Sequence, residues 1–295
     1  MDVLFFLEVL IGGLLSGTMY SLVALGFVLI FKASGVFNFA QGAMVLFAAL
    51  TFVRLVEMGW NFWLAIVVTF AAMVALAFAI ERLVLRPLVN QPLIILFMAT
   101  IGITFFLEGF TQTVWDSNVH RLDLGIKDTP WEIRGMLISQ FDVFAAVAAG
   151  TMVASLAVFF TKTRVGRALR AVADDHQAAQ SVGIPLQHIW VIVWAAAGAV
   201  ALVAGLLWGA RLGVQFSITI VALKALPVLI LGGFTSVPGA IIGGLIIGAG
   251  EKLAEVYIGP LIGGAIENWF PYMLAMIFLL FRPQGLFGEK IIERV

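Results

Sequence analysis

Long apolar runs recur along the chain, and several of them are free of Asp, Glu, Lys and Arg. Six of them cover residues 9–31, 33–53, 58–80, 87–107, 143–161 and 189–210. A helix needs about 20 apolar residues to cross a bilayer core of about 30 Å, so each run is long enough for one crossing. The pattern therefore predicts an all-α, polytopic transmembrane helical bundle.

Charged residues interrupt the apolar pattern in the C-terminal third. The three remaining runs are 212–231 with Lys224 inside it, 237–257 with Glu251, Lys252 and Glu255 near one end, and 262–281 with Glu267 near its start. The last run is a span only if Glu267 lies at the membrane interface. We count about eight spans, with seven and nine as the alternatives.

The distribution of Lys and Arg predicts the orientation. With the N-terminus outside and the C-terminus cytoplasmic, the inner loops receive ten of these residues and the outer loops six. This excess agrees with the positive-inside rule. The largest outer loop then covers residues 111–140 and the largest inner loop residues 162–187. Neither is long enough to be a soluble domain, so residues 1–295 are expected to form a single transmembrane domain.

Composition removes several classes of function. Hydrophobic residues make up 62% of the chain and charged residues 12%, and the formal net charge is zero. A balanced charge gives no electrostatic reason to bind nucleic acid. The chain has no cysteine, and its three histidines have no metal-site spacing. There is no phosphate-binding G-x-x-x-x-G-K-[ST] motif and no usable catalytic pair. We therefore expect a conduit, with no enzymatic activity and no cofactor of its own.

The inner loop predicts two short helices. In the first, Val165, Ala168, Leu169 and Val172 form an apolar stripe beside three arginines. The second runs over residues 176–182, with an aspartate as its N-cap, Gly183 at its end and Pro185 beyond. A short capped helix on this side suits docking into a partner. The alternative is a solvated loop whose arginines only follow the positive-inside rule.

Three polar residues fall within the apolar runs and are candidates for lining a translocation pathway. Asn38 and Gln41 are three apart, so they would share one helical face, with Gly35 and Gly42 allowing an unwound start. Amides also join helices without any role in transport, and that alternative has equal weight. Lys224 lies too deep to reach the interface easily, so we expect it to be paired or hydrated, with Glu8 and Glu108 as candidate partners.

Glycines spaced four apart predict close contacts between helices. Gly13 and Gly17 form one such pair, and Gly239 and Gly243 form another. Small residues at this spacing let two helix backbones approach closely.

Several segments together resemble the LivH-type permeases of branched-chain amino acid ABC importers, and the resemblance extends from the first run to the C-terminus. They are GVFNFAQGAM at 35–44, ERLVLRPL at 81–88, GRALRAVADDHQAAQSVGI at 166–184, ALKALPVLILGGFTSVPGAIIGGLIIG at 222–248 and RPQGLFGE at 282–289.

The resemblance implies a complex in the cell inner membrane. Its other members would be a paralogous permease, two ATP-binding subunits and a periplasmic solute-binding protein. It also makes the inner loop the contact to an ATPase, and the matching positions are Gly166, Arg167, Asp174, Asp175 and Gly183. One motif departs from the family, because many relatives have His-Gly-Glu where this chain has Gln-Gly-Ala at 41–43. The expected solutes therefore include related amino acids, urea and amides.

Two other functions remain open at this point. An ion-coupled secondary transporter would need a midplane ion site in matched halves, and Lys224 is the one deep ionisable residue within the runs considered. A structural membrane subunit without a pathway would tolerate apolar replacement of Asn38, Gln41 and Lys224.

Overall fold

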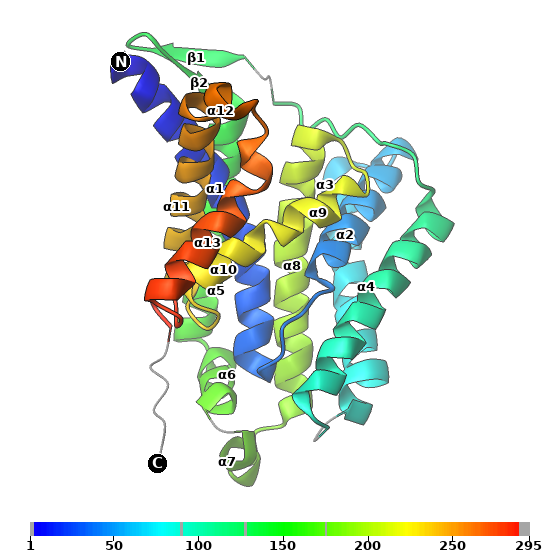
Figure 1. The fold of residues 1–295 in the computed structure, drawn as a ribbon. Helices are drawn as coiled ribbons and strands as arrows, with labels where there is room; N and C mark the ends of the chain where they lie inside the picture. Colours follow the sequence, from blue (N-terminus) through cyan, green and yellow to red (C-terminus); the bar gives the residue numbers. More distant parts are fainter. Residues whose placement is uncertain (1–2, 89–90, 127–128, 175, 289–295) are drawn as a thin grey trace. The chain divides into compact units, whose positions relative to one another are not determined.

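A computed structural model describes residues 3–88, 91–126, 129–174 and 176–288, and the described chain is mostly helical (Figure 1). The long and short helices and the two strands are α1 (Val3–Ser34), α2 (Gln41–Glu57), α3 (Phe62–Ile80), the π-helix η1 (Glu81–Leu85), the 3₁₀-helix η2 (Arg86–Leu88), α4 (Leu93–Trp115), β1 (Pro130–Ile133), β2 (Met136–Ser139), α5 (Gln140–Lys162), α6 (Arg164–Asp174), α7 (His176–Ser181), α8 (Leu186–Leu212), α9 (Ser217–Leu223), α10 (Ala225–Gly232), α11 (Val237–Tyr257), α12 (Gly259–Ile262), the 3₁₀-helix η3 (Ile266–Asn268) and α13 (Phe270–Phe281).

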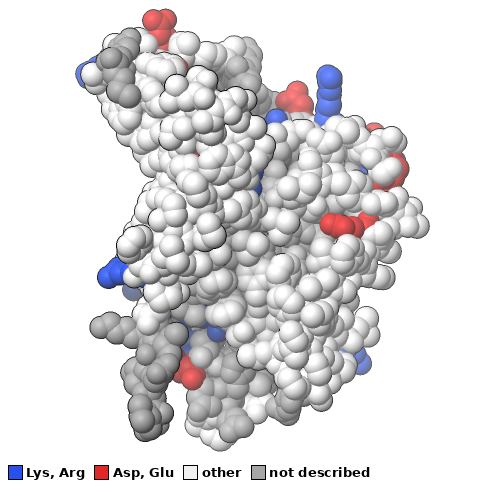
Figure 2. All heavy atoms as spheres, viewed as in Figure 1, with Lys and Arg blue, Asp and Glu red and all other residues white. Residues whose placement is uncertain are grey.

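The apolar runs of the sequence become helices with lipid-compatible surfaces. Within the described residues, six helical segments are long and apolar enough to cross a membrane: Val3–Ser34, Phe62–Leu88, Leu93–Trp115, Gln140–Lys162, Leu186–Leu212 and Val237–Tyr257. Large apolar side chains such as Phe105 and Phe106 of α4 are exposed. The face drawn in Figure 2 is mostly uncharged. The predicted all-α membrane bundle is confirmed.

The predicted count of about eight spans conflicts with the predicted orientation. A chain that crosses an even number of times ends on the side where it began, so termini on opposite sides require an odd number. Three shorter segments join the six long helices as candidates for crossing: α2, the α9–α10 pair Ser217–Gly232, and α13. Nine crossings are compatible with the N-terminus outside and the C-terminus inside.

The described chain divides into two compact units. Unit 1 comprises Met1–Leu25, Asp123–Thr151 and Leu223–Val295, and unit 2 comprises Gly26–Leu122 and Met152–Ala222. In unit 2, α2 packs against α3, α4 and α8 (Figure 1). Nearly every residue of α2 is buried as a result. Gly205 of α8 lies so close to α2 that an added Cβ would be 2.7 Å from the carbonyl oxygen of Val45.

Unit 1 is built on backbone contact between helices. Here α10, α11 and α13 pack against one another. Gly17 of α1 lies against Gly244 of α11, and Gly13 lies against Gly248. Gly239 and Gly243 face α10 instead, at Gly232 and Val228 respectively. Both glycine pairs named in the sequence therefore lie at helix contacts, where small residues allow two backbones to touch.

A β-hairpin, which the sequence analysis did not predict, lies in the expected outer loop. Strands β1 and β2 pair antiparallel, with Pro130 opposite Ser139 and Ile133 opposite Met136. The two residues between the strands are Arg134 and Gly135, with φ values of 53° and 84°. Positive φ at both central residues is typical of the type I′ turns whose twist matches that of paired strands.

Two predicted spans are interrupted where local chemistry opposes a helix. The run 33–53 is not one helix, because its first two residues end α1, residues 35–40 are non-helical and α2 starts at Gln41. The run 212–231 is broken into α9 and α10 by a turn at Lys224. Pro227 accounts for this second break, because it has no N–H to donate to the carbonyl of Leu223 and its ring crowds that carbonyl.

Adding a methyl group at Gly17 should destabilise unit 1. The Cβ of Gly17→Ala would lie 2.5 Å from the carbonyl oxygen of Gly244, which is backbone and cannot rotate away. Overpacking of this kind costs about 1–3 kcal/mol. We expect a lower melting temperature for the purified variant in detergent.

Gly12→Ala on the same helix is the matched control, because a Cβ there would have nothing within 4 Å. Its melting temperature should equal or exceed that of the parent, since Ala favours helix over Gly. Equal melting temperatures for both variants would contradict the close contact between α1 and α11.

Candidate functional site

The predicted inner loop contains two short helices in unit 2, as the sequence suggested. In α6, Leu169 and Val172 are buried and Arg164, Arg167 and Arg170 are exposed. Gly166 is buried, and an added Cβ would collide with the carbonyl oxygen of Phe160. Arg170 donates from Nη1 to that same carbonyl oxygen at 2.9 Å. These contacts hold α6 against the end of α5, which gives Gly166 a structural reason to be glycine.

The second helix, α7, leaves an apolar side chain uncovered. Ala179 is buried, but Val182 is 76% exposed. Gly183 has φ +84°, so the chain leaves α7 through a left-handed residue. Asp174 ends α6 and is exposed, whereas Asp175 lies outside the described residues. Among the predicted coupling residues, Arg167, Asp174 and Gly183 are therefore accessible in unit 2, and Gly166 is not.

Asn38 and Gln41 do not share a helical face, contrary to the sequence prediction. Asn38 precedes α2, and its Oδ1 accepts a hydrogen bond from the backbone N–H of Ala40 at 3.0 Å. Asparagine side chains compete with helix bonding in this way, which explains why the helix starts later. Gly35, with φ +69°, supplies the unwound start.

Gln41 lies inside unit 2 at a crowded helix contact. Its side chain is fully buried, and Nε2 donates to the carbonyl oxygen of Ala197 at 3.4 Å. Gly26 of α1 makes room for it, because an added Cβ would collide with the Gln41 amide. Its Oε1 has no hydrogen-bond partner among the described residues. Gln41 therefore joins helices and also carries an unused acceptor.

Lys224 lies in unit 1, where its partner is Glu251. The prediction that Glu8 or Glu108 pairs with Lys224 is wrong. Lys224 Nζ lies 3.5 Å from Glu251 Oε1, and the same oxygen accepts from the hydroxyl of Tyr20 at 3.1 Å. Glu8 instead accepts from the backbone N–H of Leu137 at 2.9 Å. Glu251 was noted only as a charge near one end of its run, and no spacing rule connects it to Lys224, which is 27 residues earlier.

The motifs at 222–248 and 282–289 contact each other in unit 1. The backbone N–H of Leu286 donates to the carbonyl of Leu231, and that of Phe287 donates to the carbonyl of Gly232. The segment after α13 therefore pairs with the end of α10. Gly233 and Gly285 approach so closely there that an added Cβ at either would clash with the backbone of the other segment. This contact explains the glycines at positions 233 and 285.

The first inner motif, ERLVLRPL, forms an internal ion pair. Glu81 in η1 is fully buried, and both of its carboxylate oxygens accept from Arg86, each at 3.1 Å. A bidentate pair of this kind satisfies a buried carboxylate, which would otherwise be costly. It fixes the turn from α3 towards α4 within unit 2.

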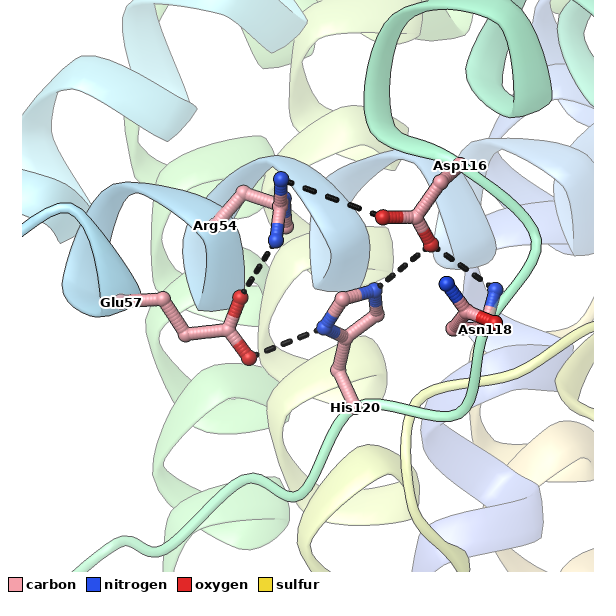
Figure 3. A network of polar contacts seen from close by, with 5 residues as sticks. All are labelled: Arg54, Glu57, Asp116, Asn118 and His120. Atoms are coloured by element: carbon pink, nitrogen blue, oxygen red, sulfur yellow. Dashed lines mark hydrogen bonds and ion pairs between the residues drawn. The ribbon is translucent and has the colours of Figure 1, made fainter.

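A polar network at the end of α2 was missed by sequence reasoning (Figure 3). Both ring nitrogens of His120 face a carboxylate oxygen, with Nδ1 2.9 Å from Glu57 and Nε2 3.1 Å from Asp116. Arg54 joins the same two acids, at 2.9 Å and 3.9 Å. The backbone of His120 also exchanges two hydrogen bonds with Val214. Only the Arg54–Glu57 pair, three apart on a helix, was visible in the sequence.

Two carboxyl groups of this network lie past the apolar runs and have shifted pKa values. The backbone N–H of Asn118 and the His120 ring hold the pKa of Asp116 below its ordinary value. Partial burial raises the pKa of Glu57, but hydrogen bonds from His120 and Arg54 outweigh it and leave that pKa lowered. Among the described residues, no group of three His, Asp or Glu side chains is placed to hold a metal ion.

Acid should weaken this end of unit 2. Because both pKa values are lowered in the folded state, the carboxylates stabilise it above their ordinary values of 3.8 and 4.5, and this contribution is lost as the pH falls through the folded values. We expect the Glu57→Gln/Asp116→Asn variant to have a lower melting temperature than the parent at neutral pH.

The melting temperature of the Glu57→Gln/Asp116→Asn variant should also depend less steeply on pH than that of the parent below about pH 4.5. Glu132→Gln, at an exposed position of β1, is the control and should follow the parent at every pH. Parallel curves for the parent and the double variant would count against the network.

The comparisons with known proteins agree with the helical, charge-poor architecture. A family model described as the permease component of branched-chain amino acid transport systems matches residues 9–281. The chain is 28% identical to the permease protein BraD of a high-affinity branched-chain amino acid transport system in Pseudomonas aeruginosa, over 100% of this chain and 99% of the relative. It is 29% identical to LivH of Escherichia coli K12, over 99% and 98%.

A solved structure shares the fold. PsaBC from Streptococcus pneumoniae, in complex with Fab, matches with a TM-score of 0.50 and 14% identity, covering 92% of this chain and 89% of that one. The family match covers nearly all of the apolar segments described above, including the motifs at 35–44, 81–88, 166–184 and 222–248. The chain belongs to the family of permease components of branched-chain amino acid transport systems.

Proposed function

We propose that this chain forms one half of the transmembrane pathway of an ABC importer that carries branched-chain or related amino acids across the cell inner membrane. The family membership and the relatives' names support the transport class. The observation in the structure that carries the proposal is the α6–α7 pair, which presents exposed arginines and the exposed Val182. Val182 directly follows α7, and an uncovered apolar side chain at the end of a short helix suits insertion into a groove of another protein.

The proposed complex contains a second, paralogous permease, two ATP-binding subunits and a solute-binding protein outside the membrane. ATP hydrolysis would occur in the partner subunits. Closure of these subunits would push on α7, and the push would pass through α6 to the helices of unit 2. The pathway would then switch from being open on one side of the membrane to being open on the other side. Asn38, Gln41 and Lys224 are the proposed polar lining, and Gln41 offers an unused oxygen for that purpose.

Gly183 tests the coupling. In the Gly183→Val variant, a β-branched residue would have to adopt φ +84°, which costs about 1–2 kcal/mol and favours another path for the chain after α7. We expect solute uptake by proteoliposomes to fall severalfold, while ATP hydrolysis and the amount of assembled complex stay near the parent level.

The control is Gly183→Asn, because asparagine enters left-handed conformations more readily than other non-glycine residues. It should retain most of the uptake. Normal coupled uptake in Gly183→Val would remove the coupling assignment.

Gln41 distinguishes a pathway from a purely structural subunit. Gln41→Leu keeps the approximate volume but removes both polar groups. If the side chain contacts solute, uptake should fall by about tenfold, the usual loss for one hydrogen bond in a buried site. Thr69→Val is the matched control, since Thr69 is also fully buried in unit 2 and its hydroxyl oxygen has no partner among the described residues.

Parent-level uptake in both variants would assign Gln41 to helix packing only. Measurement of the assembled complex by gel filtration excludes loss through misfolding.

A further inference from the structure

We propose that Lys224 and Glu251 form a binding site for the two opposite charges of an α-amino acid, with Lys224 taking the carboxylate and Glu251 the ammonium. The site rests on the proposed import function and deepens it, because it names the solute chemistry that the pathway recognises. The sequence left amino acids, urea and amides open as solutes, and this ion pair distinguishes between them.

The pair lies deep within the membrane segments of unit 1. Helices α10 and α11 are joined by a short hairpin at residues 233–236. The eight residues of α10 separate Lys224 from this hairpin by about 12 Å, and Glu251 lies about 21 Å along α11 from the same hairpin. In a core of about 30 Å, Lys224 falls near the middle and Glu251 about two thirds of the way across. Transporters place solute sites at this depth and beside broken helices, and here the break lies at Lys224 itself.

Glu251 has an unused acceptor. The residue is only 4% exposed. Oε1 accepts from Tyr20 and faces Lys224, but Oε2 is buried and has no hydrogen-bond partner among the described residues. Buried carboxylate oxygens are almost always paired, because an unpaired one keeps the full cost of its lost hydration. An ammonium group of a solute supplies the donors that Oε2 lacks.

The contact of Lys224 with Glu251 is long and uses few of the N–H donors of Lys224. Its ammonium has three N–H donors, and its distance of 3.5 Å to Glu251 is long for a charge-assisted hydrogen bond. The side chain keeps 15% of its surface exposed. A carboxylate placed beside Lys224 would use donors that Glu251 does not.

The charge arrangement matches a free amino acid and not a neutral solute. An α-amino acid carries an ammonium and a carboxylate on the same carbon. When it lies between Lys224 and Glu251, one long ion pair is exchanged for two, and all four charges stay compensated in an apolar surrounding. Urea and amides have no charge to offer, so their entry would separate the pair without replacing it. No bond is made or broken in this step.

The complete importer, reconstituted in proteoliposomes with ATP and an excess of the same solute-binding protein, tests the site. Initial uptake is measured for each radiolabelled protein amino acid, and for urea and acetamide. The variants are Lys224→Gln, Glu251→Gln and the double variant that carries both changes. Lys252→Gln is the matched control, since Lys252 is the neighbour of Glu251 and is paired at 4.0 Å with a different acid, Glu267.

We expect the parent to import an amino acid and neither urea nor acetamide. Each single variant and the double variant should lower its uptake by about tenfold or more, the loss expected for a hydrogen bond to a charged group. Lys252→Gln should keep the parent rates of uptake and of ATP hydrolysis, and every variant should still assemble into the complex.

Two results would overturn the site. Parent-level uptake in the double variant would show a purely structural pair, because removing both members of a buried pair is often harmless to folding. Import of urea or acetamide as fast as any amino acid would show that charge is not recognised. If the parent complex imports no solute at all, the proposed import function fails as well, and this outcome is recognisable before any variant is examined.

Discussion

The absence of water in the bilayer core determines most of this structure. A membrane segment cannot leave backbone N–H and C=O groups unpaired, so the chain is mostly helical where it is apolar. Lipid also removes the hydrophobic advantage of packing helix against helix, which leaves close contact and polar bonds to hold helices together. Both appear here, in the glycine contact between α1 and α11 and in the hydrogen bond from Gln41 to Ala197.

The same constraint concentrates charge at a few places. Glu81 is buried but accepts two hydrogen bonds from Arg86, and Glu57 and Asp116 each contact both His120 and Arg54 (Figure 3). The Lys224–Glu251 pair differs from these, because its distance is long and one carboxylate oxygen is left without a partner in the described residues. A fully satisfied ion pair holds a fold in place, whereas an incompletely satisfied one has capacity for a solute. This contrast supports assigning recognition to Lys224 and Glu251.

The sequence predicted what depends on composition and local pattern. Apolar runs located the long helices, and Gly183 with the preceding polar residues located the end of α7. The helix break at Lys224 was not predicted, although Pro227 is a sequence signal for it. Glu251 was not predicted as the partner of Lys224, because only the packing of α10 on α11 brings the two residues close. The contacts of His120 were missed for the same reason, since residues 57 and 120 meet through the fold. The number of spans stays a prediction, because charged and broken segments such as 212–231 do not follow a length rule.

The tagged chain can be isolated from native membranes in mild detergent, its partners identified by mass, and the eluate assayed for ATPase activity. We expect an ATP-binding subunit and a second permease to be recovered with it, and ATP hydrolysis to be stimulated by an amino acid and its binding protein. Recovery of the chain alone, without ATPase activity, would contradict an ATP-driven importer and would make α7 an ordinary loop helix.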